Sequence, residues 1–159
     1  MFRVGIGHDT HRTIKGLPLI LGGVSIPADF GLDGHSDADV LLHAVTDAII
    51  GAAGLGDIGE WFPDTSAEFA GADSRELLRR VIEQVHGQDW SVVNLDGIIF
   101  AERPKLSAYK QTIKESLSTL LGVDPSVINI KAKTGERVGP IGRGEAMEAQ
   151  VVVLLSKKD

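Results

Sequence analysis

The chain has 159 residues, 43% of them apolar and 24% charged, a balance typical of one globular domain with a single core. Its net charge of −6 argues against a nucleic-acid-binding protein, whose surface is usually basic. It has no cysteine, so disulfides and thiolate metal sites are excluded, and a metal ion must bind His, Asp or Glu.

The first half of the chain predicts a mixture of strands and one long helix. The helix begins after Ser36 or Asp37, either of which can cap it, and carries a regular apolar stripe. In chain order we expect a strand over 2–8, two short strands or one bent strand over 17–26, a loop over 27–37, the helix over about 38–53, and a glycine-rich loop over 54–65 with at most one helical turn.

The second half of the chain predicts alternating helices and strands. It predicts a helix from 73 or 74 to about 86, a strand over 90–101, a helix over 106–121, a strand over 127–132 and a last strand over 146–155. The last strand is the most apolar, which predicts a central or interfacial position. The order predicts an α+β fold with one mixed β-sheet and helices packed on one face, as a single domain over 1–159.

Three residues suggest a metal site. Asp9 and His11 stand two apart, so on a strand both side chains point to one face, although an isolated pair of this kind is more often an ordinary surface pair. His43 lies in the first helix, with Asp39 and Asp47 one turn before and after it. That stripe is either a solvated face or a metal-binding imidazole oriented by an acid, and the apolar character of the helix favours the second. Two histidines and one carboxylate leave an open position on zinc, and the same set can hold ferrous iron.

Other segments suit phosphate. The start of the first helix, after His35-Ser36-Asp37, offers free N–H groups to an anion. Residues 131–136 place lysines, a hydroxyl, a glycine and an acid after a strand, a combination that suits phosphate and Mg²⁺. Arg143 stands between two glycines, where backbone can approach an anion closely. Helix capping and ordinary polar turns explain these segments equally well, as they do the loops 56–59 and 62–65.

Six segments together carry a more specific signal, since they occur in one order across nearly the whole chain. They are GHDTH at 7–11, HSDADVLLHAVTDAIIGAAGLGDIGEWFPDT at 35–65, GADSRELL at 71–78, AERPKL at 101–106, KAKTGE at 131–136 and GRGE at 142–145. In this set the chain resembles the 2-C-methyl-D-erythritol 2,4-cyclodiphosphate synthase family of the non-mevalonate isoprenoid pathway.

The resemblance implies a phosphorus-oxygen lyase. Its substrate is 4-diphosphocytidyl-2-C-methyl-D-erythritol 2-phosphate, whose 2-phosphate attacks the β-phosphorus, closes the ring of 2-C-methyl-D-erythritol 2,4-cyclodiphosphate and releases CMP. The resemblance also implies a cytoplasmic enzyme, or one of the plastid stroma after removal of a transit peptide. We see no signal peptide in residues 1–12 and no membrane span, and expect neither nucleic acid nor membrane as a partner.

The resemblance also implies a role for each matching position. These roles are Zn²⁺ ligands for Asp9, His11 and His43; catalysis and a ligand of a second ion, Mg²⁺ or Mn²⁺, for Glu136; phosphate contacts and catalysis for Lys133 and Thr134; phosphate contacts for His35 and Ser36; contacts to the methylerythritol part for Asp57, Phe62 and Asp64; and the cytidine pocket for Ala101, Pro104, Lys105 and Leu106.

An assembly is implied as well: a homotrimer around a threefold axis, with active sites between subunits. Arg143 would lie near the axis, bind an anion there and pair in part with Glu145, and the family suggests an isoprenoid diphosphate as that anion. The chain departs from the family pattern at Lys133 and Gly135, where many members have threonine, and at Pro140, where many have phenylalanine.

Two other functions remain open at this point. One is a metal-dependent hydrolase in which zinc activates water, which would use the same three ligands. The other is a non-catalytic trimeric or anion-binding module. A preference for cytidine distinguishes the synthase from both.

Overall fold

The computed structural model describes residues 1–157, so the last two positions of the expected domain lie outside the described residues. Its elements are β1 (Phe2–Lys15), β2 (Leu19–Leu21), β3 (Val24–Ile26), β4 (Phe30–Leu32), α1 (Val40–Ala53), α2 (Ile58–Trp61), η1 (Ala67–Phe69), α3 (Ser74–His86), β5 (Trp90–Phe100), η2 (Leu106–Ala108), α4 (Lys110–Leu121), η3 (Pro125–Val127), β6 (Ile128–Lys133), α5 (Gly139–Gly142) and β7 (Ala146–Lys157). Within this described part, no helix has the length and apolar character needed to cross a membrane.

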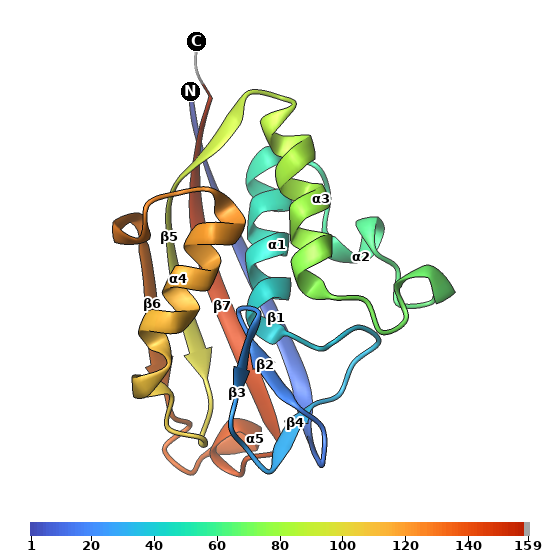
Figure 1. Ribbon diagram of the computed structural model, residues 1–159, viewed down its shortest axis with the longest axis vertical. Helices are drawn as coiled ribbons and strands as arrows, with labels where there is room; N and C mark the ends of the chain where they lie inside the picture. Colours follow the sequence, from blue (N-terminus) through green and yellow to red (C-terminus); the bar gives the residue numbers. More distant parts are fainter. Residues whose placement is uncertain (158–159) are drawn as a thin grey trace.

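The main sheet has five strands in the order β4-β1-β7-β5-β6 (Figure 1). β5 and β6 run parallel, whereas the other neighbouring strands run antiparallel, so the sheet is mixed. The apolar last strand, β7, is central, as its composition predicted. The prediction of an α+β fold with a mixed sheet is confirmed.

The long helices α1, α3 and α4 lie together on one side of the sheet (Figure 1). Along β1, Gly5 and Gly7 are buried, whereas the alternate side chains of Phe2, Val4 and Ile6 are 70%, 68% and 60% exposed. We call the sheet face that carries these three side chains the open face. A Cβ atom on Gly5 would lie 1.9 Å from the carbonyl oxygen of Ala48, so the glycine lets α1 pack directly against the strand.

Four local predictions were wrong. β1 continues to Lys15 because its second half pairs with both β7 and β4. β4 itself lies inside the segment predicted as a loop. The N-cap of α1 is Asp39, since its carboxylate accepts a hydrogen bond from the N–H of Leu42 at 3.0 Å. The helix predicted from Leu106 begins as the short helix η2, and α4 follows it.

Candidate active site

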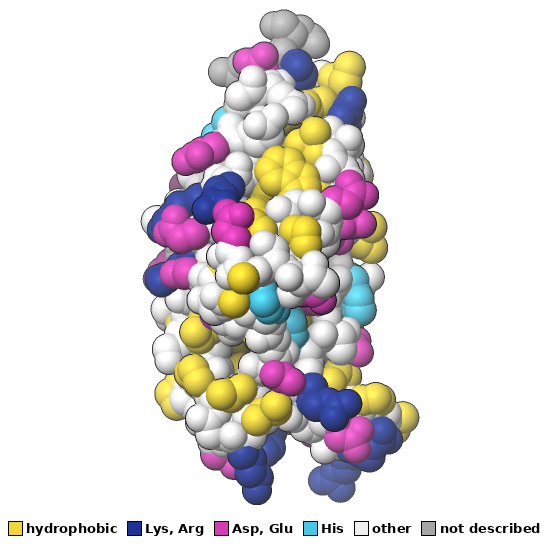
Figure 2. All heavy atoms as spheres, turned by 90° about the vertical axis from the view of Figure 1, so that its right-hand side faces the viewer, with side chains coloured by type: hydrophobic (Ala, Val, Ile, Leu, Met, Phe, Trp, Pro, Cys, Tyr) yellow, Lys and Arg dark blue, Asp and Glu magenta, His cyan; other side chains and the backbone are white. Residues whose placement is uncertain are grey.

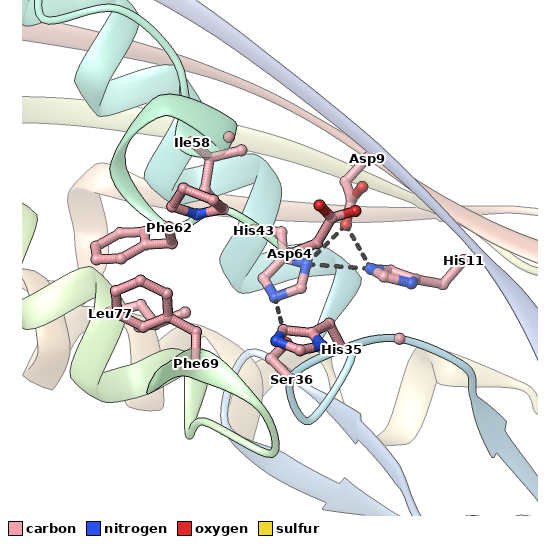
Figure 3. A pocket seen from close by; sticks show the side chains of 13 residues that line it. Asp9, His11, His35, Ser36, His43, Ile58, Phe62, Asp64, Phe69 and Leu77 are labelled. Carbon is pink, nitrogen blue, oxygen red and sulfur yellow. Dashed lines mark hydrogen bonds and ion pairs between the residues drawn. The ribbon is translucent and has the colours of Figure 1, made fainter. Parts of the chain in front are cut away.

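β1 and α1 bring the predicted metal ligands together. Asp9 and His11 both point from β1 toward α1, where His43 lies in the first turns of the helix (Figure 3). Asp9 Oδ2 lies 2.8 Å from His11 Nε2 and 2.9 Å from His43 Nδ1. The two imidazole nitrogens are 3.1 Å apart. One atom from each of three residues therefore converges on a single point, as a metal site requires.

The donor set fits a small divalent cation. His11 Nδ1 lies 2.6 Å from the carbonyl oxygen of Asp33, which can only accept, so Nδ1 keeps its proton and Nε2 is the nitrogen that can bind a metal. In tetrahedral zinc with bonds of about 2.0 Å, ligand atoms are about 3.3 Å apart, close to the spacing of this set. Three ligands also leave the fourth position free for a substrate oxygen.

The electrostatics of the site favour a cation. Burial by itself would raise the pKa of Asp9, but hydrogen bonds with His11 and His43 outweigh it and hold that pKa well below its usual range. Burial would lower the pKa of His11, but the Asp9 carboxylate outweighs burial and raises it. Asp9 is therefore ionised at neutral pH, and its charge is directed at the point where the ligand atoms meet.

A cavity of about 470 Å³ opens beside these ligands. Its polar side carries the metal ligands with His35, Ser36 and Asp64, and its apolar side carries Ile58, Phe62, Phe69 and Leu77 (Figure 3). Histidine side chains gather near the middle of this face of the molecule (Figure 2). A cavity with one polar and one apolar side suits a ligand that joins a phosphate to a carbon chain.

Two residues predicted near this cavity have local partners. His35 Nε2 lies 2.8 Å from the carbonyl oxygen of Ser66, which ties the loop before α1 to the loop after α2. Asp57 is the N-cap of α2 and accepts a hydrogen bond from the N–H of Glu60 at 2.9 Å. Asp57 thus holds the short helix from which Ile58 enters the cavity wall.

The residues predicted for cytidine and for the second ion form another group, at the ends of β5 and β6. The N–H of Ala101 donates to the carbonyl of Lys133 at 2.9 Å, and the N–H of Gly135 donates to Glu102 at 3.0 Å. Thr134 Oγ1 donates to Glu136 at 2.9 Å. In this way the structure joins segments 101–106 and 133–136, with Pro104, Lys105 and buried Leu106 in the first of them. β7 separates this group from β1 and its metal ligands.

Arg143 follows the short helix α5 and pairs with Glu145. Its Nε and Nη2 atoms donate to the two carboxylate oxygens at 2.8 and 3.0 Å. The pairing with Glu145 agrees with the sequence analysis. A cavity of about 630 Å³ lies beside this turn, lined by Thr10, Arg12, Thr13, Pro140, Gly144, Glu145 and Ala146.

The acids expected to orient His43 have other partners, so that interpretation was wrong. Asp39 is fully buried and accepts hydrogen bonds from the N–H groups of Gly22 and Gly23 at 2.9 and 2.6 Å, besides its capping bond. Asp47 accepts from the N–H of Ile58 at 3.1 Å. Both acids fix the fold around the site, because each holds a loop against α1.

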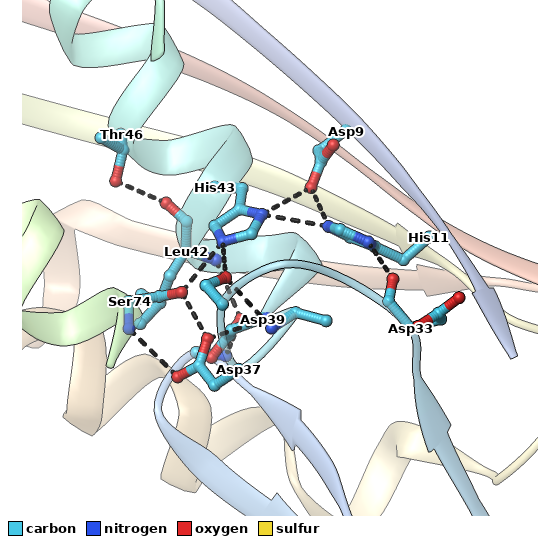
Figure 4. Close-up of polar contacts among 12 residues, drawn as sticks. Asp9, His11, Asp33, Asp37, Asp39, Leu42, His43, Thr46 and Ser74 are labelled. Carbon is cyan, nitrogen blue, oxygen red and sulfur yellow. Dashed lines mark hydrogen bonds and ion pairs between the residues drawn. The ribbon is translucent and has the colours of Figure 1, made fainter. Parts of the chain in front are cut away.

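The contacts of His43 Nε2 come instead from residues that the sequence analysis missed or placed elsewhere. This nitrogen lies 2.9 Å from Ser74 Oγ (Figure 4) and 3.0 Å from Ser36 Oγ (Figure 3). Ser74 in turn is bound to Asp37. Ser74 belongs to the segment GADSRELL, but the sequence analysis treated it and Asp37 only as helix starts.

Comparison with known proteins decides the family. The model of the YgbB family matches residues 2–156. The chain belongs to this family. It is similar, at 54% identity over 99% of both chains, to the 2-C-methyl-D-erythritol 2,4-cyclodiphosphate synthase of Chromobacterium violaceum. The resemblance found in the sequence is confirmed.

Solved structures agree with this assignment. The bifunctional IspDF of Campylobacter jejuni aligns with a TM-score of 0.96 and 43% identity over 100% of this chain, which spans 43% of that longer protein. The CDP complex of IspF from Plasmodium falciparum aligns with a TM-score of 0.87 and 34% identity over 99% of this chain and 97% of that one.

Proposed function

We propose that this member of the YgbB family converts 4-diphosphocytidyl-2-C-methyl-D-erythritol 2-phosphate to 2-C-methyl-D-erythritol 2,4-cyclodiphosphate and CMP. It is an enzyme of isoprenoid synthesis, a phosphorus-oxygen lyase acting as one domain over 1–159. The observation that carries the proposal is the convergence of Asp9, His11 and His43 beside a two-sided cavity, in a chain 54% identical to a synthase.

The reaction exchanges one phosphorus–oxygen bond for another. An oxygen of the 2-phosphate attacks the β-phosphorus, the bond from that phosphorus to the bridging oxygen breaks, and CMP leaves with the electron pair. Such a step needs alignment and positive charge rather than covalent help. Zn²⁺ on the three ligands would supply that charge to phosphate oxygens, which a chain of net charge −6 cannot provide by its overall field.

Around the metal site, the chain's own side chains would hold the substrate. His35 and Ser36 line the polar wall and would contact phosphate oxygens, to which the hydroxyl of Ser36 can donate. Phe62 and Asp64 line the same cavity and would contact the carbon skeleton and hydroxyls of methylerythritol. Asp57 would act through the short helix α2, which it caps and which carries Ile58 into the cavity wall.

The second group would bind the other end of the substrate. Glu136 would hold Mg²⁺ or Mn²⁺, because a carboxylate is the ligand such hard cations prefer. Lys133 and Thr134 would contact the phosphates. Ala101, Pro104, Lys105 and Leu106 would form the cytidine pocket, and a relative of the same fold has been solved as a CDP complex.

We further propose a homotrimer in which each active site uses two subunits. The metal ligands lie on β1, next to the edge strand β4, whereas the cytidine group follows β5 and the opposite edge strand β6. A threefold arrangement would place these two edges of neighbouring copies side by side. The exposed apolar side chains of the open face also favour burial against other copies.

Arg143 would bind an anion near the threefold axis. An arginine stays protonated, so three copies brought together need more than their own Glu145 partners as counterions. The 630 Å³ cavity beside the turn offers space for phosphate or a diphosphate. An isoprenoid diphosphate there, and the cytoplasmic location of the enzyme, stay predictions.

Nucleotide binding tests the proposal against the hydrolase alternative. We expect a crystal soaked in CDP to show cytosine against 101–106, with the diphosphate directed toward the metal ligands. Zinc-dependent hydrolysis of a generic phosphodiester, with no preference for cytidine, would favour the hydrolase instead.

A further inference from the structure

We propose that Ser74 and Asp37 are positioning residues that fix which ring nitrogen of His43 faces the metal. The inference rests on the proposed role of His43 as a metal ligand. It concerns two residues outside the ligand set: Ser74, which reaches the ring from the start of α3, and Asp37, which holds Ser74 from the loop before α1 (Figure 4).

The hydrogen-bonding capacity of Ser74 is fully used. Ser74 is only 1% exposed, and its backbone N–H donates to Oδ2 of Asp37 at 3.1 Å. Its hydroxyl donates to Oδ1 of the same carboxylate. Because Asp37 Oδ1 accepts this bond, the single hydroxyl hydrogen of Ser74 is committed to Asp37. The side of Ser74 Oγ that faces His43 therefore carries lone pairs.

This arrangement determines the tautomer of His43. Because Ser74 Oγ can only accept at its 2.9 Å contact with Nε2, the ring proton belongs on Nε2. Nδ1 is then the nitrogen left for a metal, and it lies 2.9 Å from Asp9 and 3.1 Å from His11 Nε2. The carbonyl of Asp33 has the same effect on His11: it accepts from Nδ1, which leaves Nε2 for the metal. In each imidazole the nitrogen away from the site keeps its proton, so the nitrogen beside Asp9 is the one that can give a lone pair to a metal.

Ser36 plays a different part, although it is almost equally close to Nε2. Its Oγ lies 3.0 Å from that nitrogen and accepts from the N–H of Ala38 at 3.2 Å. Both of these contacts use lone pairs, so the hydroxyl hydrogen of Ser36 remains available to the cavity that Ser36 lines. Ser74 thus orients the metal ligand His43, whereas the hydroxyl of Ser36 can bind the substrate.

Zinc affinity without substrate tests the inference. For Ser74→Ala we expect an affinity about 10–100-fold lower in chelator competition, the usual cost of losing a partner that orients a ligand. Ser74→Thr keeps the hydroxyl and should restore most of the affinity. Ser36→Ala should bind zinc nearly as tightly as the unchanged protein while its turnover falls.

A matched control separates positioning from simple support of the fold. Ser118 is also buried at a helix end and donates to the carbonyl of Val123 at 2.6 Å, on α4. Ser118→Ala should lower the melting temperature but leave zinc affinity unchanged. Native zinc affinity in Ser74→Ala, or an equal loss in Ser118→Ala, would overturn the proposal.

The unchanged protein offers a test that needs no variant. In the zinc-loaded protein, long-range ¹H–¹⁵N correlation spectra should show the proton of His43 on Nε2 and the metal on Nδ1. Metal on Nε2 would refute the inference even if Ser74→Ala failed to fold. Neither measurement uses substrate, so a failure of the proposed synthase activity would be seen separately.

Discussion

Gly7 on β1 lies directly under the carbonyl oxygen of Ala44 on α1, at a place where a Cβ atom would be 1.9 Å from that oxygen. Ala44 is the neighbour of His43, and Gly7 lies two residues before Asp9. This close approach of helix to strand therefore sets the distance between the two elements that carry the metal ligands.

Gly7→Ala should separate these elements. The added methyl group meets backbone atoms that cannot rotate away, so we expect a loss of about 3 kcal/mol in the free energy of unfolding, the upper end of the usual cost of overpacking. In the folded fraction, zinc affinity should also fall, because His43 moves away from Asp9. Urea unfolding and chelator competition measure the two effects.

Gly51→Ala is the matched control on the same helix. An added Cβ there meets nothing within 4 Å. Alanine should stabilise the helix by about 0.5–1 kcal/mol and leave zinc affinity unchanged. If Gly7→Ala proved as harmless as Gly51→Ala, the close packing of α1 on β1 would not be what positions the metal site.

His43→Ala and Asp9→Ala should abolish turnover without unfolding the protein. Each removes one ligand of three, so zinc affinity should fall by more than about 100-fold, beyond the loss expected for an orienting residue. Zinc content after dialysis and circular dichroism check the two parts of this expectation. A His43→Ala variant that kept both its zinc and its rate would exclude the proposed ligand set.

Glu136→Gln should affect only the second ion. Glu136 lies after β6, in the group that β7 separates from the zinc ligands, and glutamine removes the charge while nearly keeping the shape. We expect loss of Mg²⁺ or Mn²⁺ dependence with zinc content unchanged. Loss of zinc in this variant would show that Glu136 belongs to the zinc site rather than to a site for a second ion.

Asp39 should make stability depend on pH. Burial raises its pKa to about 6, although the hydrogen bonds from Leu42, Gly23 and Gly22 lower it in part. The folded state then favours protonated Asp39. The stability that this protonation contributes is fully present below the unfolded pKa near 4 and is lost as the pH rises through 6.

Comparison with Asp39→Asn isolates that contribution. Between pH 4 and pH 7 the native protein should lose up to about 3 kcal/mol of unfolding free energy relative to Asp39→Asn. A constant difference over this range would show that Asp39 ionises normally in the folded protein.

Much of the fold was predictable from local patterns. The apolar stripe of α1 and the capping residue of α3 identified those helices, and the apolar run of β7 identified the central strand. β4 was not predictable, because its three residues form a strand only by pairing with Thr13–Lys15. Nothing within the segment itself distinguishes it from a loop.

The convergence of the candidate metal ligands was also predictable, since Asp9 and His11 share a strand face and His43 interrupts an apolar helix. Their supporting residues were not. Ser74 and His43 are 31 residues apart in the sequence, and their contact exists only because α3 packs beside α1. Asp39 and Asp47 lie at the expected helical spacing from His43, yet their carboxylates bind backbone N–H groups of other loops. Sequence spacing shows which residues can meet, whereas tertiary packing decides which of them do.

Incubation with the proposed substrate tests the central claim most directly. The purified protein, loaded with Zn²⁺ and Mg²⁺, is mixed with 4-diphosphocytidyl-2-C-methyl-D-erythritol 2-phosphate and followed by phosphorus NMR. We expect the resonances of the substrate to be replaced by those of CMP and of a cyclic diphosphate with two coupled phosphorus atoms, and His43→Ala to leave the substrate intact. Release of inorganic phosphate, or of CMP together with an open-chain bisphosphate, would show that water rather than the 2-phosphate is the nucleophile and would contradict the account.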